Sequence, residues 1–352
     1  MAFDIVGDIV ILKPPLKYPP EEYVKKILEK HKFVRVILLQ QTDVQPPYRV
    51  PEYKVLWGEN RTETIHKEFG LKFKVDVVRT YYSPRLSNER YRIAKMIGDG
   101  ERVLVMFAGV NPYAIYIVKF ARPKVVYSIE LNPFAVKYGL ENVEINKVQN
   151  KIITILGDVR KVSPLISLFG NKSGYIHSEE TYILDTLSSG IVLNLSVIEP
   201  CADYRIQELY DKIPAGKKYI VTNNIGSLEN PYKYNGFVRI DRNKFYVYNF
   251  NENVVEEYKL FGEMFDRIIM PLPREADTFL DVAIPLIKEN GIIHLYQFMF
   301  EDEIPEKANE ILDKYASLLG FEYKILNIKK VGDIAPRQYR VCIDFEITKK
   351  DC

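Results

Sequence analysis

Alternating apolar and polar residues predict a series of short elements in the first part of the chain. Residues 3–12 alternate with a period of two, which predicts a strand with a turn at Gly7 and Asp8. Residues 21–30 have helical spacing and follow two prolines, which suit the start of a helix. Further strands are predicted over 33–39, 53–57, 63–68 and 71–77. The pattern predicts a small α+β unit over residues 1–80, joined to the next part by residues 81–100, with a helix over 86–97.

Strands and helices alternate from residue 101 onward, which is the pattern of a parallel sheet covered on both faces. Strands are predicted over 104–107, 124–129 and 151–156, with a helix over 112–120. The same order resumes with a strand over 267–270, helices over 276–288 and 305–319, a strand over 292–297 and two final strands. The predicted fold class is therefore α/β, with this unit formed by residues 101–162 and 264–352.

A stretch of roughly a hundred residues, 163–263, interrupts that order. It contains mixed strands, among them a hairpin predicted over 237–240 and 245–250. Connections in α/β units usually have roughly 2–6 residues, so a connection of this length is treated as an inserted subdomain. The pattern assigns it no role.

Three residues at the ends of predicted strands indicate a cofactor site. Gly109 lies in the tight turn after the first strand, Glu130 ends the second, and Asp158 follows the third. Glu130 comes 21 positions after Gly109, close to the roughly 20-residue offset at which a carboxylate reaches a ribose in nucleotide-binding units. Asp158 could accept a hydrogen bond from an adenine amino group. Each acidic residue taken alone is more often a helix cap, but the ordered series favours an adenosine-containing cofactor.

The turn itself argues against a dinucleotide. Gly109 is its only glycine, and Asn111 and Tyr113 stand where small residues would be needed for backbone amides to approach a pyrophosphate. A turn of this kind suits a cofactor without phosphates, and S-adenosylmethionine is the usual one. The residues predicted to bind it are Phe107, Gly109, Asn111, Glu130, Leu131, Asn132, Asp158 and Val159.

Composition is that of an ordinary globular protein. The chain has 352 residues, of which 47% are hydrophobic and 27% charged, and no apolar run approaches the roughly 18 residues needed to cross a bilayer. The start of the chain lacks a basic leader and a cleavage site, so we expect a cytoplasmic protein. Cys201, Cys342 and Cys352 have neither a metal-ligand spacing nor the even number of a disulfide framework, so we expect reduced cysteines and no metal.

Charge is unevenly distributed along the chain. Residues 1–100 hold 18 Lys and Arg against 13 Asp and Glu, whereas residues 165–260 hold 10 against 12. The first hundred residues therefore supply the basic surface, and a phosphate backbone is a plausible partner. The alternative is a solvated surface whose imbalance has no function.

Eight stretches of the sequence resemble, in the same order, the archaeal and eukaryotic tRNA methyltransferases that modify N1 of guanine 37, beside the anticodon. The most specific are GENR with TIHKE at 58–68 and SPRL with NER at 83–90. The matching stretches are DIVGDIVIL at 4–12, GENRTETIHKEFG at 58–70, YYSPRLSNERYRI at 81–93, VLVMFAGVNPY at 103–113, IELNPFAV at 129–136, ILGDVRKV at 155–162, RIIMPLPREADTFLDVA at 267–283 and APRQYR at 335–340.

The resemblance implies a class I S-adenosylmethionine-dependent methyltransferase domain preceded by an RNA-binding domain. It places Glu89 at the position of the general base that removes the proton of guanine N1. It places Arg49 where a guanidinium stabilises negative charge on guanine O6. Tyr81 and Pro273 match positions that pack against the target base, which is swung out of the anticodon loop. Arg85 and Pro271 complete the predicted substrate-binding set.

Three departures from the family pattern concern the substrate and the cofactor. Pro271 replaces an asparagine whose amide would contact the target guanine, and Asn111 replaces a glycine near the methionine moiety. The sequence also opens at the family's second domain, without the module that many archaeal relatives place on the tRNA elbow. Altered base contacts are compatible with an altered substrate.

We therefore expect a monomeric tRNA (guanine-37 N1)-methyltransferase whose partner is the anticodon stem and loop. One alternative is a bifunctional wyosine-pathway enzyme that also methylates the tricyclic 4-demethylwyosine base. Another is a tRNA-binding homologue without catalysis. Some relatives transfer the aminocarboxypropyl group of the cofactor instead, but these generally lack the base carboxylate, so Glu89 favours methyl transfer.

Overall fold

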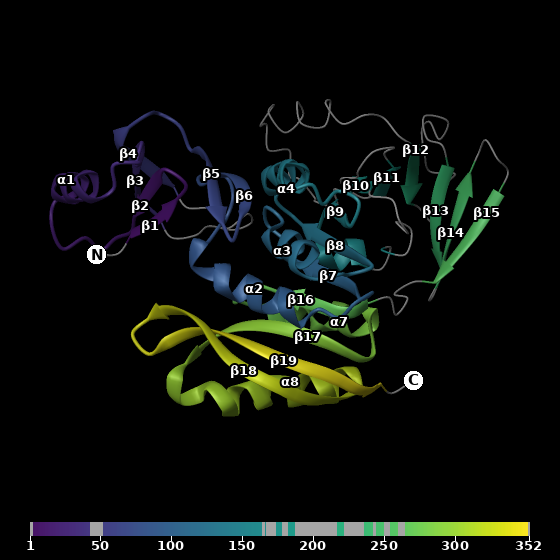
Figure 1. Ribbon diagram of the computed structural model, residues 1–352. Helices are drawn as coiled ribbons and strands as arrows, with labels where there is room; N and C mark the ends of the chain where they lie inside the picture. The colour runs from purple at the N-terminus through teal and green to yellow at the C-terminus, as the bar shows by residue number, and fades with distance from the viewer. Residues whose placement is uncertain are drawn as a thin grey trace.

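The computed structural model describes residues 3–42, 52–163, 166 and 265–350, together with the backbone of six strands between 174 and 259 (Figure 1). A four-stranded sheet lies at one end of the molecule and three of those six strands lie at the other. These three strands are the outer end of the larger sheet, whose central strands and helices occupy the middle of the molecule. Among the described residues, no helix is both long and apolar enough to cross a membrane.

The N-terminal sheet has the order β1-β2-β3-β4. Its elements are β1 (Phe3–Val6), β2 (Ile9–Leu12), α1 (Pro20–Lys30), β3 (Val36–Gln40) and β4 (Tyr53–Gly58). The first two strands form an antiparallel hairpin around Gly7, whose φ of +56° suits glycine. Helix α1 carries the chain from β2 to the parallel strand β3, and its buried Tyr23 and Ile27 pack against the sheet. The elements predicted for this part are confirmed, with the third strand beginning three residues later than predicted.

A second hairpin, β5 (Glu63–Glu68) and β6 (Leu71–Asp76), docks on helix α4 (Pro133–Ile145) through two asparagines. The carboxamide of Asn142 accepts from the Lys74 amide at 2.6 Å and donates to the Lys74 carbonyl at 3.0 Å. Asn146, one turn further on, makes the same pair with Lys72 at 3.0 and 2.7 Å. Residues four apart on a helix and two apart on a strand lie on one face of each. The two side chains therefore pair with the edge of β6 as a neighbouring strand would.

The large sheet contains a parallel part and an antiparallel part. Its order is β15-β14-β13-β12-β11-β10-β9-β8-β7-β16-β17-β19-β18. Strands β7 to β9 are parallel, as are β7 with β16 and β16 with β17, whereas β19 is antiparallel to both of its neighbours. The main elements are η1 (Pro84–Leu86), α2 (Ser87–Met96), β7 (Arg102–Met106), α3 (Pro112–Phe120), β8 (Val125–Glu130), β9 (Ile152–Leu156), α5 (Val159–Val162), β16 (Phe265–Met270), η5 (Ala276–Phe279), α7 (Leu280–Leu286), β17 (Ile287–Phe300), η6 (Glu301–Glu303), α8 (Ile304–Leu319), β18 (Phe321–Ala335) and β19 (Gln338–Lys350).

The order in which strands are added to the sheet reverses between β7 and β16, although the two strands are parallel. From β7 the chain moves outward to β8 and β9, and it later returns to the other side of β7 with β16 and β17. In open α/β sheets, ligands bind outside the carboxyl ends of the strands at such a switch point. The predicted α/β fold is confirmed, and its topology predicts a ligand site beside the carboxyl ends of β7 and β16.

Side chains that alternate along the central strands fill two hydrophobic layers. Leu104, Met106 and Ile268 face the layer that contains α7 and α8. Val103, Val105 and Ile269 face the layer that contains α2, α3 and α4. Both faces of the parallel strands are therefore covered, as the near-continuous apolar runs predict.

Six strands between 174 and 259 extend the sheet beyond β9. They are β10 (Gly174–His177), β11 (Tyr182–Thr186), β12 (Lys217–Val221), β13 (Gly236–Asp241), β14 (Lys244–Asn249) and β15 (Val254–Lys259). Strand β10 pairs in parallel with β9, and β13 and β14 form the predicted antiparallel hairpin.

The helix predicted over 276–288 ends earlier than predicted. A 3-10 turn and α7 cover 276–286, and β17 begins at Ile287 rather than at residue 292. Pro285 lies inside α7, and a proline cannot donate the backbone hydrogen bond that a helix interior needs.

Replacing Asn142 by alanine tests the asparagine pairing. The backbone amide and carbonyl of Lys74 would lose their partners, so we expect the free energy of unfolding to fall by about 2–3 kcal/mol. Chemical denaturation measures this change. The control is Asn150→Ala, at an exposed position after α4, where a change within about 0.5 kcal/mol is expected. Equal stability of both variants would contradict the pairing.

Candidate active site

Gly109 and Glu130 meet at the carboxyl ends of β7 and β8. Gly109 has a φ of +56°, and a Cβ there would lie 3.7 Å from the carbonyl oxygen of Tyr81. One oxygen of Glu130 accepts from the Gly109 amide at 2.7 Å and the other from the Asn132 amide at 2.8 Å. The carboxylate therefore fixes the turn after β7 to the end of β8. Because a carboxylate oxygen can accept more than one hydrogen bond, this arrangement is also compatible with ribose hydroxyls.

Asn111 is fully buried and adopts a left-handed backbone with φ of 66°. Asparagine tolerates this conformation better than most residues with a Cβ. Its side-chain amide donates to the Thr154 hydroxyl on β9 at 2.8 Å. The backbone of Asn111 is used within the turn and the first helical turn, since its amide donates to the Ala108 carbonyl and its carbonyl accepts from the Ile115 amide, both at 3.1 Å. Its side-chain oxygen is buried and has no hydrogen-bond partner in the described part of the chain.

The other predicted cofactor residues surround the same edge of the sheet. Phe107 is half-buried, has a φ of 56° and packs edge-on against Phe279 at 4.8 Å. Leu131 is half-buried, and Val159 is buried in the core.

Two of these residues also serve as helix caps. The Asn132 side chain accepts from the Phe134 and Ala135 amides at the start of α4. The Asp158 side chain accepts from the Arg160 amide at 2.8 Å and caps the short helix α5. For Asp158 the cap that sequence reasoning offered as the alternative is present in the structure.

Glu89 lies on α2 with only 4% of its surface exposed. Its two oxygens accept from Nε and Nη2 of Arg92, both at 2.7 Å. The Tyr296 hydroxyl on β17 donates to Oε1 at 2.6 Å. Tyr296 also accepts from the Tyr113 hydroxyl at 3.2 Å, and Tyr113 lies in the first turn of α3, directly after the glycine turn. Through these two tyrosines the candidate base is connected to the candidate cofactor turn.

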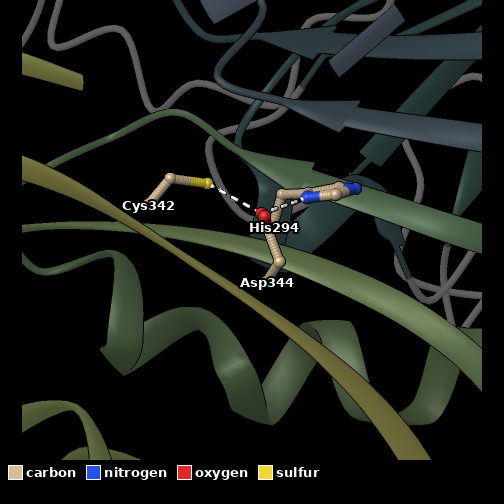
Figure 2. Close-up of side chains that lie close together, drawn as sticks. All are labelled: His294, Cys342 and Asp344. Atoms are coloured by element: carbon tan, nitrogen blue, oxygen red, sulfur yellow. Dashed lines mark hydrogen bonds and ion pairs between the residues drawn. The ribbon is translucent and has the colours of Figure 1, made fainter. Parts of the chain in front are cut away.

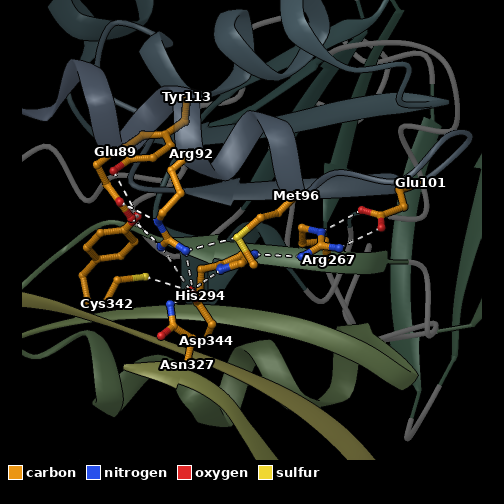
Figure 3. Close-up of polar contacts among 11 residues, drawn as sticks. Glu89, Arg92, Met96, Glu101, Tyr113, Arg267, His294, Asn327, Cys342 and Asp344 are labelled. Atoms are coloured by element: carbon orange, nitrogen blue, oxygen red, sulfur yellow. Dashed lines mark hydrogen bonds and ion pairs between the residues drawn. The ribbon is translucent and has the colours of Figure 1, made fainter. Parts of the chain in front are cut away.

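The polar contacts of Glu89 continue beneath α2 as a chain of alternating charge (Figure 3). Arg92 donates to Asp344 on β19 at 2.7 Å, and Asp344 contacts Nδ1 of His294 at 2.6 Å. The other ring nitrogen of His294 lies 3.0 Å from Nη1 of Arg267. Arg267 in turn pairs with Glu101 through two hydrogen bonds, at 2.7 and 2.8 Å. The network extends from the carboxyl edge of the sheet, at Glu89, to the amino ends of the strands, at Glu101.

His294, Cys342 and Asp344 lie close enough to suggest a metal site (Figure 2). Arg267 can only donate, so Nε2 of His294 must accept and Nδ1 must carry the proton given to Asp344. Both ring nitrogens are thus used. Burial raises the pKa of the Cys342 thiol well above its ordinary value, and the thiol donates to Asp344 at 3.1 Å. His294, Cys342 and Asp344 therefore use these atoms in hydrogen bonds to one another and to two arginines. Arg92 and Arg267 supply the positive charge that a metal ion would otherwise bring.

The predicted substrate residues fall into two groups. Tyr81 is 48% exposed beside the glycine turn, and its hydroxyl accepts from Arg340 at 3.1 Å. Pro271 and Pro273 follow β16 at the same edge, and the Pro273 carbonyl accepts from the Phe298 amide. Arg85 instead pairs with Asp4 of β1 at 2.6 Å.

Arg49, the predicted partner of Glu89, lies outside the described residues.

Sequence reasoning did not identify the residues that surround Glu89. Arg92 and Tyr296 bond to Glu89 directly, and Tyr113, Asp344 and His294 are connected to it through them. Arg340, beside Tyr81, was not identified either. A signal was present, because His294 and Asp344 interrupt the short apolar runs IIHLY and VCIDF, and a buried polar or charged side chain needs a partner.

A profile described as the TRM5/TYW2 methyltransferase domain matches residues 64–194 and 238–326, which is more than half of the chain. A second profile, the TYW2 N-terminal domain, matches residues 1–62. The chain belongs to the TRM5/TYW2 methyltransferase family, and its fold is that of a class I S-adenosylmethionine-dependent methyltransferase.

Named relatives extend over nearly the whole chain. The tRNA (guanine(37)-N(1))/4-demethylwyosine(37)-methyltransferase Taw22 of Nanoarchaeum equitans is 37% identical over 98% of this chain and 99% of its own length. Methanocaldococcus jannaschii Trm5, solved in complex with adenosine, is 26% identical with a TM-score of 0.61, over 99% of this chain and 75% of that one. The structure of aTrm5 in complex with tRNALeu is 26% identical with a TM-score of 0.62, and the match covers 99% of this chain and 72% of that one.

The buried His294 predicts a pH dependence of stability. Burial, together with the charges of Arg267 and Arg92, holds the pKa of His294 below its ordinary value of 6.5, although Asp344 opposes this. Below pH 6.5 the unfolded chain therefore takes up a proton on His294 that the folded chain does not. The contribution of His294 to the free energy of unfolding is fully present above this pH and is lost as the pH falls. We expect wild type to lose up to about 1.4 kcal/mol per pH unit relative to His294→Gln in this range. Denaturation at pH 7.5, 6.5 and 5.5 measures the difference, and parallel pH curves would contradict a neutral His294.

Proposed function

We propose that this member of the TRM5/TYW2 methyltransferase family methylates N1 of guanine 37 in tRNA, with Glu89 as the general base. The observation that carries the proposal is the connection of a buried carboxylate to the glycine turn through Tyr296 and Tyr113. The names of the relatives support the substrate, and the relative solved with tRNALeu supports tRNA as the partner.

The residues at the strand ends fit an adenosine-containing cofactor without phosphates. The turn after β7 holds a single glycine, and Glu130, an acidic residue, faces its amide. Such a site favours hydroxyl groups and disfavours a pyrophosphate. When bound, S-adenosylmethionine supplies a methyl group activated by a positively charged sulfur.

Guanine N1 carries a proton at neutral pH, so a base must take this proton as the nitrogen forms its new bond to carbon. The Glu89 carboxylate is suited to this because Arg92 and Tyr296 hold it in place and water has little access to it. When Glu89 takes the proton from guanine N1, its negatively charged carboxylate becomes a neutral carboxylic acid. In the family pattern, Arg49 stabilises the charge that develops on O6, and Tyr81 and Pro273 pack on the base.

We further propose that residues 1–80 form the RNA-binding part. Residues 1–80 hold 14 Lys and Arg against 11 Asp and Glu, and Tyr81 follows them directly and lies beside the glycine turn; both observations support this assignment.

Substrate choice has a second candidate. The relative from Nanoarchaeum equitans, similar over nearly the full length of both chains, carries both guanine-37 and 4-demethylwyosine activity in its name. Pro271 stands at the position of an asparagine in the family pattern and changes the contacts available to the target base. This change favours an enzyme that accepts both guanine 37 and 4-demethylwyosine. A bifunctional enzyme is therefore the alternative to a guanine-specific one.

A methylation assay distinguishes these activities. We expect the purified chain to transfer labelled methyl from S-adenosylmethionine to a G37 transcript and not to its A37 counterpart, with mass-spectrometric mapping to position 37. Transfer to a tRNA that carries 4-demethylwyosine would establish the bifunctional alternative. Label transferred from the aminocarboxypropyl carbons, equal labelling of G37 and A37, or no labelling would each contradict the proposal.

Substituting Glu89 by glutamine tests its role as base. The amide keeps an acceptor for Arg92 and Tyr296 but cannot take the proton, so we expect turnover to fall roughly 10²- to 10⁴-fold. Cofactor affinity, measured by calorimetry, should remain that of wild type, whereas Glu130→Ala should weaken it. Turnover retained in Glu89→Gln would exclude this carboxylate as the base.

A further inference from the structure

We propose that Tyr296 and Arg92 are positioning residues that orient Glu89 so that its Oε2 atom takes the proton from the target base. The inference deepens the proposed function and rests on it. It concerns which oxygen of the carboxylate acts and which side chains decide this.

The two oxygens of Glu89 have different environments. Oε1 accepts from Nη2 of Arg92 at 2.7 Å and from the Tyr296 hydroxyl at 2.6 Å. Oε2 accepts from Nε of Arg92 at 2.7 Å, its single donor in the described part of the chain. A carboxylate oxygen has two lone pairs in the carboxylate plane. Oε1 is therefore saturated, and Oε2 keeps one lone pair for a proton.

Arg92 is itself held from the opposite side. Its Nη1 donates to Oδ2 of Asp344 at 2.7 Å, and Nη2 lies 3.3 Å from Oδ1. Asp344 is fully buried and also receives hydrogen bonds from His294, Cys342 and Asn327. Although burial opposes it, the hydrogen bonds from His294 and Arg92 hold the pKa of Asp344 well below its ordinary value of 3.8. The guanidinium is a planar fork with fixed donor directions, so an anchored Asp344 also fixes the edge that faces Glu89.

The tyrosines supply the second constraint. Tyr113 donates to Tyr296 at 3.2 Å, which directs the Tyr296 proton toward Glu89. Burial raises the pKa of both phenols, so both keep their protons and act as donors. Because Tyr113 directly follows Pro112 at the start of α3, the orientation of Glu89 depends on the position of the turn that begins at Gly109.

Tyr296→Phe tests the proposal with little change in shape. It removes the hydrogen bond to Oε1 and keeps the buried ring, so both oxygens of Glu89 would then have one donor each. We expect the single-turnover rate of methyl transfer to fall by roughly tenfold, with unchanged Kd for tRNA and for S-adenosylmethionine. The matched control is Tyr127→Phe, a fully buried tyrosine on β8 whose hydroxyl contacts Arg102, and its rate should equal that of wild type.

Arg92→Lys and Asp344→Asn test the other side of the arrangement. Lysine cannot make the two parallel hydrogen bonds, so we expect a loss of rate at least as large as that of Tyr296→Phe. Asp344→Asn keeps the shape but removes the charge that anchors Arg92, and we expect a smaller loss with binding unchanged. If either variant fails to fold, judged by its thermal transition, the result for Tyr296→Phe decides.

The outcomes separate this inference from the proposed function. A wild-type rate in Tyr296→Phe, in an enzyme that Glu89→Gln inactivates, would overturn the inference and leave the function intact. A loss of rate explained by weaker binding of tRNA or cofactor would also overturn it. Inactive wild type, or active Glu89→Gln, would contradict the proposed function instead.

Discussion

The Arg92 guanidinium lies between two buried carboxylates, Glu89 on its own helix and Asp344 on β19. Moving charges out of water is costly, and the cost is offset only where opposite charges meet with good hydrogen-bond geometry. Arg92 meets both carboxylates at 2.7 Å, and loss of any member would leave an uncompensated charge in the interior. Helix α2 is therefore fixed to the sheet in one register, and the candidate base has one position relative to the strand ends.

The same arrangement joins parts of the molecule that fold from distant segments. Arg90, the residue after Glu89, points the other way and pairs with Glu68 at the end of β5. The β5–β6 hairpin is held on α4 by Asn142, which also donates to the carbonyl of Val110 in the glycine turn. The N-terminal part, the helix that carries Glu89 and the turn after β7 are thus connected by hydrogen bonds. Since the proposed tRNA-binding part and the cofactor turn share these contacts, a substitution in either part is expected to affect both.

Local sequence patterns predicted the cofactor edge because its geometry is local. Parallel strands place their carboxyl ends at one edge, so Gly109, Glu130 and Asp158 could be assigned to one site from their order alone. Patterns did not reveal the environment of Glu89, because it depends on the pairing of β17 with β19. That register sets His294 opposite Asp344 and Tyr296 opposite Cys342, and cross-strand neighbours of this kind cannot be read from either strand alone.

The sequence by itself determined the α/β fold class, most of the order of strands and helices in the described residues and, through resemblance, the family to which the chain belongs; it also predicted the edge at which the cofactor binds. Each of these follows from periodicity or from motifs within a few tens of residues. The tertiary structure alone decided that Glu89 is buried, that Arg92 and Tyr296 hold it, and that Arg85 pairs with Asp4. Arg92 lies one turn after Glu89 on the same helix, but Tyr296 is 207 positions away, so only the packing of α2 on the sheet could bring it to Glu89.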